Sequence, residues 1–430
     1  MSHYKPYPAY KDSGDDWLGK VPVDWAISPL KYRLRLLNEK TSERSNMVSL
    51  ENIEGWTGRH LETGAEYEGE GIYFQIGDIL FGKLRPYLAK VFRAGKSGQA
   101  IGDFYVLRPD NGVNPKYAQY WLLSPKAIDR LNGATLGTKM PRVSWDDMGR
   151  MPITWPGIDE QITIAAHLDH ETARIDALIN RKTRFIELLR EKRQALITQA
   201  VTKGLDPNVK MKDSGVEWLG EVPEHWEVKR LKFIATVQTG VAKGKDTADQ
   251  KTIEVPYLRV ANVQDGYLDL SEVATIEIVA SDLSRYLLQP GDVLMNEGGD
   301  FDKLGRGHVW NGEIESCIHQ NHVFAVRPHG LSSRWLNTFA SSSAAQFYFM
   351  GRSKQSTNLA SISSSNLMEL AVPLPPDVEQ KAILDKLASV LVRVDSSLQK
   401  TERSIELLKE RRSALITAAV TGQIDLREAA

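Results

Sequence analysis

The sequence of 430 residues holds a single cysteine, Cys317. An internal disulfide is therefore excluded, and such sparing use of cysteine is typical of a reducing compartment. Long apolar runs are lacking too, because none reaches the ~18 residues of a membrane-spanning helix. The first ten residues, MSHYKPYPAY, lack the apolar core of a signal peptide. We therefore expect a soluble cytoplasmic protein.

An excess of either charge is also missing, since 54 Lys and Arg face 55 Asp and Glu, for a net charge of −1. This balance excludes a uniformly basic coat for nucleic acid. The charge is nevertheless uneven along the chain. Residues 39–78 hold three basic and nine acidic side chains, whereas residues 79–150 hold twelve basic and five acidic ones. The basic stretch is the part expected to face a polyanion.

Motifs that carry enzyme chemistry are absent from the sequence. The stretches around Gly95-Lys96-Ser97 and GVAKGKD at 240–246 both fail the spacing of a phosphate-binding loop, and no strand–GxGxxG–helix unit is present. Pro109-Asp110 lacks the glutamate that would complete a nuclease carboxylate cluster. We therefore expect no catalytic residue and no cofactor bound by this chain.

A metal site is likewise not expected. His319 and His322 lie near Cys317, but no second ligand pair follows at the spacing of a zinc finger. A structural or DNA-contact role is the preferred interpretation of these side chains. His167 and His170 lack the glutamate of an HExxH helix and are interpreted as surface groups.

The chain does contain an internal repeat. Residues 11–31 match residues 212–232 at an offset of 201, with 12 of 21 positions identical, and residues 186–202 match residues 405–421 at an offset of 219. The second copy is thus 18 residues longer between the shared segments. GDIL at 77–80 pairs with GDVL at 291–294, so that 13 of the extra residues precede this element and five follow it. A tandem duplication with divergent loops is the simplest interpretation.

Each copy ends in a pattern typical of a long helix with a heptad-like seam. The seam positions are Ile164, Leu168, Thr172, Ile175, Ile179, Lys182, Ile186, Leu189 and Arg193, and then Ile383, Leu387, Leu391, Val394, Leu398, Thr401, Ile405, Leu408 and Arg412. Helices of ~40 residues would be ~60 Å long and could not bury their apolar stripes alone, so we expect them to pack antiparallel on one another. Prolines at 156, 373, 375 and 376 mark their starts, and glycines at 204 and 422 their ends. The polar seam pairs Lys182/Thr401 and Arg193/Arg412 either set the register or lie on a solvated face.

The remaining sequence predicts two mixed α/β regions. Short apolar runs bounded by Gly and Pro predict strands at 79–81, 87–92, 103–107, 257–260, 293–295 and 322–326. Helices are predicted at 115–123 and 334–350. Trp17, Trp25, Trp218 and Trp226 have no basic cluster nearby, which favours packing over base stacking.

Candidate DNA-contact residues lie in the variable loops of both copies, because cations suit phosphates and guanine whereas amides suit adenine. In the first copy the candidates are Lys83, Arg85, Tyr87, Lys90, Thr138, Lys139 and Arg142. In the second copy they are Arg259, Asn262, Gln264, Asn296, Lys303, Arg306, His308, Gln320, Asn321, Thr357 and Asn358. A solvated edge strand remains the alternative for residues 81–93, and ordinary turn residues are the alternative for the amides.

These segments together carry a resemblance. KDSGxxWLGxVPxxW, GDILFGKLRPYLAKV, YLRVANVQDGYLDLSEV, NEGGDFDKLGRGHVW, PPxxEQ and the helix end ELLxE[KR]RxALITxAVT resemble the DNA-specificity (S) subunit of type I restriction–modification systems, the HsdS family. The similarity covers nearly the whole chain and includes both copies of the repeat.

The resemblance implies an α+β fold. Two mixed α/β target-recognition domains are separated by two long antiparallel coiled-coil helices, with an internal pseudo-two-fold repeat. The expected parts are an N-terminal conserved segment at 1–31, recognition domain 1 at 32–155, a central spacer helix region at 156–211, a repeated segment with recognition domain 2 at 212–374, and a C-terminal spacer helix region at 375–430.

The resemblance also implies a division of labour. Each recognition domain would read one half of a bipartite site in double-stranded DNA, and the helices would set the spacer and dock two modification (methyltransferase) subunits. Restriction (translocase/nuclease) subunits would complete the complex. S-adenosylmethionine, ATP and magnesium would bind to partner subunits, which would methylate adenine and cleave. A coiled-coil scaffold with two protein-binding domains, and a nuclease or methyltransferase in its own right, remain the alternatives.

Overall fold

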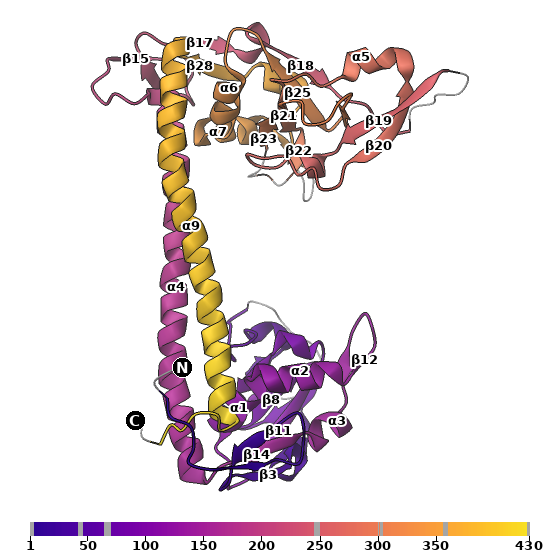
Figure 1. Cartoon of the computed structure of the whole chain (residues 1–430), viewed down its shortest axis with the longest axis vertical. Helices are drawn as coiled ribbons and strands as arrows, with labels where there is room; N and C mark the ends of the chain where they lie inside the picture. Colours follow the sequence, from indigo (N-terminus) through magenta and orange to yellow (C-terminus); the bar gives the residue numbers. More distant parts are fainter. Residues whose placement is uncertain are drawn as a thin grey trace. The chain divides into compact units, whose positions relative to one another are not determined.

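The structure is a computed structural model that describes residues 4–41, 46–63, 70–244, 250–299, 301, 304–355 and 360–427. The chain divides into two compact units (Figure 1). Unit 1 comprises residues 1–183 and 402–430, and unit 2 comprises residues 184–401. None of the helices in the described ranges is both long enough and apolar enough to cross a bilayer.

Two long helices, α4 (Ile158–Lys203) and α9 (Asp377–Val420), contribute to both units. In unit 1, Ile164 and Leu168 near the start of α4 share a core with Leu415 and Ala419 near the end of α9. In unit 2 the order is reversed, and the end of α4 shares a core with the start of α9. The antiparallel packing predicted from the seams is therefore confirmed within each unit.

The described seam positions are all buried or half-buried, as the periodicity predicts. Both helices also begin and end where the sequence marks them. Each starts beside a buried glutamine whose side-chain amide donates to a proline carbonyl, Gln161 to Pro156 at 2.8 Å and Gln380 to Pro375 at 2.9 Å. After each helix a glycine adopts a left-handed conformation, with φ of +74° at residue 204 and +72° at residue 422.

Each unit contains a four-stranded antiparallel sheet with the same strand order. In unit 1 the order is β4 (Leu34–Leu37), β11 (Phe104–Pro109), β8 (Ile79–Gly82) and β9 (Val91–Arg93). In unit 2 it is β18 (Ala235–Thr239), β25 (Val323–Pro328), β21 (Val293–Asn296) and β23 (Gly307–Val309). The repeat detected in the sequence is thus a repeat of the fold.

The same ion pair, between a buried aspartate and a partly exposed arginine, braces both sheets. Asp78 accepts two hydrogen bonds from Arg108, at 2.8 and 2.7 Å, and Asp292 accepts two from Arg327, at 2.7 and 2.8 Å. These bonds raise the pKa of both guanidinium groups. The aspartate of each GD[IV]L element therefore ties the loop before one strand to the neighbouring strand.

A second sheet differs between the units, and this is where the two copies diverge. Unit 1 has β5 (Lys40–Thr41), β7 (Gly71–Phe74), β10 (Gly98–Ala100) and β6 (Met47–Val48) in this order. Unit 2 has β20 (Ala274–Val279), β19 (Thr252–Leu258) and β24 (Ile318–His319) in this order. The short helix α5 (Leu283–Tyr286) follows β20 in the chain.

Short helices cover the sheets. Unit 1 has α1 (Pro115–Leu123), α2 (Pro125–Gly133) and α3 (Trp145–Arg150), and unit 2 has α6 (Ser333–Ala340), α7 (Ser343–Arg352) and α8 (Ser364–Met368). The helix predicted at 115–123 is confirmed. The single helix predicted at 334–350 is wrong, because Ser342 is extended and caps a new helix by accepting from the amide of Ala345.

The strand predicted at 87–92 is also wrong over its first half. Residues 86–88 form the 3₁₀ turn η3 (Pro86–Leu88), and the strand begins only at Val91. Arg85 and Ala89 flank this turn with φ of 50° and 47°. Positive φ on both sides and the missing amide hydrogen of Pro86 prevent an extended strand here.

The repeated N-terminal segments fold alike. Each forms a short hairpin, β1 (Tyr10–Asp12) with β2 (Lys20–Pro22) and β15 (Met211–Asp213) with β16 (Glu221–Pro223). Each also pairs with the strand before the following long helix, β3 (Ala26–Pro29) with β14 (Pro152–Trp155) and β17 (Glu227–Arg230) with β28 (Ala371–Leu374). Trp25 and Trp226 are fully buried in these cores, which confirms the packing role expected of them.

Candidate nucleic-acid interface

In unit 1 the fold brings together the two basic stretches that the sequence singled out. Lys83 and Arg85 follow β8, and Arg142 begins β13 (Arg142–Val143), which pairs with β12 (Thr135–Leu136). The amide of Arg85 donates to the carbonyl of Pro141 at 2.7 Å, and the amide of Val143 donates to that of Lys83 at 3.1 Å. Loops 83–88 and 137–142 therefore form one surface.

Asp103 organises this surface, and sequence reasoning missed it. Its carboxylate accepts two hydrogen bonds from Arg142, at 2.9 and 3.2 Å, and lies 3.9 Å from the Lys83 ammonium. The Asp103 carboxylate raises the pKa of the Arg142 guanidinium. Lys83 also stands over the ring of Tyr105, 5.4 Å from its centroid. The only sequence signal for Asp103 is its position directly before β11.

The exposure of the seven predicted contact residues in unit 1 separates them into two groups, and Lys83 and Lys90 form the half-buried one. Five of them are exposed and able to meet a ligand, namely Arg85, Tyr87, Thr138, Lys139 and Arg142. Lys90 is half-buried, and its ammonium donates to the carbonyl of Leu50 at 2.6 Å. Lys90 therefore anchors the loop at Leu50, and its contact with DNA stays a prediction.

In unit 2 three predicted stretches converge on the 3₁₀ turn η5 (Val260–Asn262). The side-chain amide of Asn296, at the end of β21, donates to the carbonyl of Val263 at 2.8 Å. The side chain of Gln320 accepts from the amide of Val260 at 3.4 Å. Segments 257–266, 296–310 and 319–322 therefore meet at one place in the fold.

Asn262 corrects the sequence-based assignment. Its side chain is 3% exposed, accepts from the amide of Arg259 at 2.8 Å, and donates to the carbonyls of Asp269 and Glu272. Asn52 plays the same part in unit 1, where it accepts from the amide of Ser49 at 2.9 Å. These amides close equivalent turns, and Asn262 is not available to a base.

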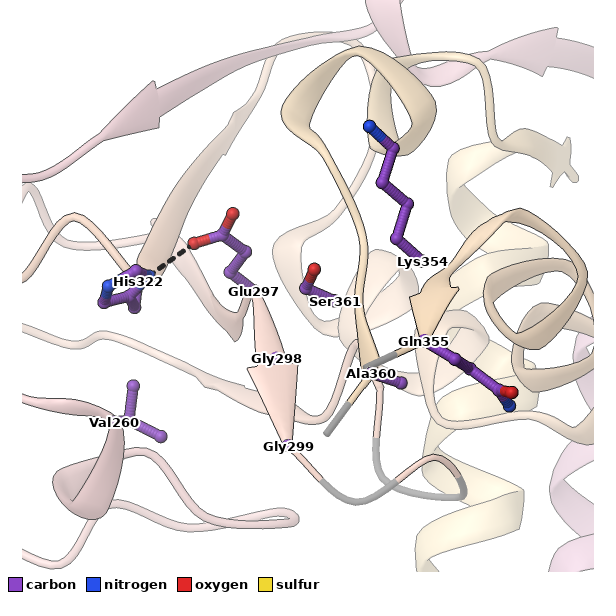
Figure 2. Close-up of a pocket in the computed structure, with 9 residues that line it drawn as sticks. All are labelled: Val260, Glu297, Gly298, Gly299, His322, Lys354, Gln355, Ala360 and Ser361. Carbon is purple, nitrogen blue, oxygen red and sulfur yellow. Dashed lines mark hydrogen bonds and ion pairs between the residues drawn. The ribbon is translucent and has the colours of Figure 1, made fainter. Parts of the chain in front are cut away.

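A cavity of about 520 Å³ lies beside this convergence (Figure 2). It is lined by Val260, Glu297, Gly298, Gly299, His322, Lys354, Gln355, Ala360 and Ser361. The glycines belong to β22 (Gly298–Gly299), which pairs with β27 (Ala360–Ser361), and β27 also pairs with β26 (Lys354–Gln355). The sequence indicates a structural or DNA-contact role for His322, but it carries no signal for Glu297 or Ser361 or for the grouping of the three residues.

Three predicted contacts, Lys303, Thr357 and Asn358, lie outside the described residues.

The other predicted contacts of unit 2 are half-buried and have neighbours within the domain. Arg259 lies 3.7 Å from Glu272, and Arg306 lies 3.9 Å from Asp265. The side chain of Gln264 donates to the carbonyl of Ala261. Asn321 and His308 are half-buried as well, and the side-chain amide of Asn321 lies 3.5 Å from Nε2 of His322. DNA contacts of these five residues stay predictions. To bind DNA, Arg259 and Arg306 would have to release the carboxylates of Glu272 and Asp265.

The histidines near Cys317 have separate roles. His319 is buried, and its Nδ1 bonds to the carbonyl of Val323 at 2.7 Å, whereas Nδ1 of the exposed His322 bonds to Glu297 at 2.7 Å. Burial lowers the pKa of His319 and raises the pKa of Cys317 to about 12. Within the described ranges, no three His, Cys, Asp or Glu side chains gather as a metal site would require.

The comparisons with known proteins agree with this geometry. Residues 223–407 match the family described as "Type I restriction modification DNA specificity domain". The chain is 24% identical over 426 residues to the type I restriction enzyme MjaVIII specificity subunit of Methanocaldococcus jannaschii, with 95% of each chain covered. It is 22% identical over 327 residues to the EcoKI specificity subunit of Escherichia coli, covering 74% of this chain and 68% of that protein.

Another relative is matched over a shorter span. The alignment with the putative MjaX specificity subunit of M. jannaschii, at 27% identity over 206 residues, spans about half of both chains, 47% of each.

Solved structures share the fold. A chain from a study of complex assembly and conformational transition of the type I R-M system has a TM-score of 0.72 at 17% identity, covering 93% of this chain and 98% of that chain. The HsdS subunit from Thermoanaerobacter tengcongensis has a TM-score of 0.51 at 18% identity, covering 94% of this chain and 98% of that chain.

A twice-repeated α/β domain with variable loops, attached to long antiparallel helices, is thus a fold that the chain shares with the HsdS subunit. The match to the family model over residues 223–407 and the alignments with curated relatives make the chain similar to type I restriction–modification specificity subunits.

Proposed function

We propose that this chain is the sequence-specific DNA-binding subunit of a type I restriction–modification complex, in which each recognition domain reads one half of a bipartite DNA site. Its repeated fold carries the proposal: the sheets of both units have the same strand order, yet the loops that would meet DNA differ in sequence and charge. One scaffold with two sets of contact chemistry suits two different half-sites.

The long helices would determine the gap between the half-sites. A helix of 46 residues, the length of α4, measures about 69 Å at 1.5 Å per residue. That length is sufficient to separate two DNA contacts by one B-DNA turn of ~34 Å or more. We propose that α4 and α9 also dock two methyltransferase subunits.

In this proposal the chain itself carries out no chemistry. Methylation of adenine would take place on the methyltransferase subunits with S-adenosylmethionine, and cleavage on restriction subunits with ATP and magnesium. Since an adenine must leave the base stack to be methylated, the specificity subunit would hold the duplex while its partners extrude the base.

Co-expression of the chain with the methyltransferase subunit encoded beside it, followed by mapping of methylated adenines across the host genome, tests the proposal. A bipartite motif with a fixed gap is the expected result. Methylation without a motif, or with one continuous motif, would contradict it and favour the scaffold alternative.

A further inference from the structure

Three positions of the repeated fold come together at the same place in both units. Lys83 and Glu297 are equivalent, since each is the first residue after the strand that begins in the GD[IV]L element, β8 or β21. Asp103 and His322 are equivalent as well, since each directly precedes the neighbouring strand, β11 or β25. The amide of Lys83 donates to the carbonyl of Asp103 at 2.9 Å, and the amide of Glu297 donates to that of His322 at 2.9 Å. The backbone framework is therefore the same.

The third position is Arg142 in unit 1 and Ser361 in unit 2. Arg142 forms a β-bridge with Leu84, and Ser361 pairs with Gly298, the residue equivalent to Leu84. The residue after each also bonds alike, because the amide of Val143 reaches the carbonyl of Lys83 at 3.1 Å and the amide of Ile362 reaches that of Glu297 at 2.9 Å.

We call these positions the junction residues: Lys83, Asp103 and Arg142 in unit 1, and Glu297, His322 and Ser361 in unit 2.

The side chains at the junction carry reversed polarity in the two units. In unit 1 two cations flank the Asp103 carboxylate. In unit 2 a carboxylate takes the place of Lys83, and the Nδ1–H of His322 donates to Oε2 of Glu297 at 2.7 Å (Figure 2). An acceptor therefore replaces a donor at the first position.

The junction side chains are partly open in both units. Glu297 is 28% exposed and His322 56% exposed, and both line the 520 Å³ cavity. Among the described residues, Oε1 of Glu297 accepts no hydrogen bond, so that one oxygen remains available while His322 holds the other. Lys83 and Arg142 are open to a similar extent, at 29% and 47%.

The chemistry of DNA gives these two arrangements different ligands. Phosphates repel a nearby carboxylate, so a carboxylate at a DNA surface needs a hydrogen bond from a base to offset the repulsion. In the major groove, the amino group at N4 of cytosine is the donor that Asp and Glu contact. Lys and Arg instead pair with O6 and N7 of guanine.

We propose that the junction residues determine base identity in both half-sites, with unit 1 preferring guanine and unit 2 preferring cytosine at the equivalent place. This inference rests on the proposed function, because it concerns the same DNA-reading surface. His322 and Asp103 are positioning residues that orient Glu297 and the two cations, respectively.

The test uses the complete modification complex with the variant Glu297→Gln, and Glu277→Gln on β20 as a control with the same change of charge in the same domain. Methylation rates are compared on duplexes that carry each of the four bases at every position of the second half-site. We expect Glu297→Gln to reduce the preference for cytosine at one position about tenfold, with the first half-site unchanged. Glu277→Gln should leave both half-sites unchanged.

A second variant keeps the test decisive if Glu297→Gln folds poorly. His322→Ala removes the group that orients the carboxylate, and it should weaken selectivity at the same base pair as Glu297→Gln. In unit 1, Lys83→Ala should weaken the preference for guanine at one position of the first half-site only.

Other outcomes overturn the inference. Unchanged base preferences in the variants would refute it while the bipartite motif, and with it the proposed function, stood. A uniform loss of affinity on all sequences would identify phosphate contacts instead. If the unmodified complex showed no motif at all, the proposed function itself would be wrong.

Discussion

Arg412 of α9 and Asp176 of α4 form an ion pair in unit 1, with 3.0 Å between Nε and Oδ1. The equivalent residues of the repeat, Arg193 and Asp395, form the same pair in unit 2 at 3.1 Å. The sequence left open whether these arginines set the helix register or lie on a solvated face. The structure gives each a carboxylate on the opposite helix, which favours a role in register.

The two ion pairs should contribute unequally to stability. The unit 1 side chains are 9% and 15% exposed, against 37% and 51% in unit 2, and Arg412 also donates to the carbonyl of Trp56 at 2.8 Å. Arg412→Ala leaves the carboxylate of Asp176 largely buried and without a cation, so this variant should lower the free energy of unfolding by about 3 kcal/mol. Arg193→Ala should cost less than about 1 kcal/mol. Urea denaturation of both variants measures the difference, and equal losses would contradict this assignment.

The glycine after α9 should be sensitive to substitution. Gly422 has a φ of +72°, and a Cβ there would overlap the ring of Pro22. Gly422→Ala should therefore destabilise the protein by about 2 kcal/mol or more, since strain and overlap add. Gly14 has a similar φ of +73° but nothing within 4 Å, so Gly14→Ala should cost only about 1 kcal/mol. Thermal unfolding of the two variants separates backbone strain, which both share, from overlap with neighbouring atoms, which only Gly422→Ala introduces.

Cations on the unit 1 surface should contribute to DNA affinity through phosphates. Arg85→Ala and Lys139→Ala should each weaken binding on all sequences and reduce the slope of log K against log salt by about 1. Lys20→Ala, an exposed cation outside the recognition domain, is the control. Titration of the modification complex with duplex DNA at several salt concentrations is the measurement. Unchanged affinity in both variants would show that DNA does not lie on loops 83–88 and 137–142.

Unit 2 should lose stability in mild acid because of His319. Burial lowers its pKa in the folded state, so below about pH 6.5 the unfolded chain binds a proton that the folded chain does not. The free energy of unfolding should then fall by up to about 1.4 kcal/mol per pH unit until the folded-state pKa is reached. His319→Asn should flatten this dependence between pH 7.5 and 5.5 in denaturant titrations. If the free energy of unfolding of the variant falls equally steeply with pH, another titrating group causes the dependence.

Much of the fold is local enough to be predicted from the sequence. The helix limits follow from proline, glycine and the spacing of apolar residues, and the repeat of α4 and α9 follows from direct identity. The sequence-based prediction is wrong for the strand at 87–92 and the helix at 334–350, where the backbone geometry depends on single residues. The turn at Pro86 needs positive φ at Arg85, and the break before α7 needs Ser342 as a cap. Neither has a periodic signal.

The candidate site was predicted as stretches of sequence rather than as contacts. Charge counts drew attention to residues 79–150, but they could not show that Asp103 lies between Lys83 and Arg142. An amide in a loop suits a base or a turn equally well, and only the three internal bonds of Asn262 decide between them. Contacts between distant residues depend on the pairing of strands, which the sequence does not state.

The central claim is that each recognition domain reads one half-site independently. Replacing residues 32–155 with the corresponding segment of a related specificity subunit of different target tests this claim most directly, with methylated adenines mapped across the genome before and after. The account predicts that one half of the motif changes while the other half and the gap stay the same. A motif altered in both halves, or in neither, would contradict it.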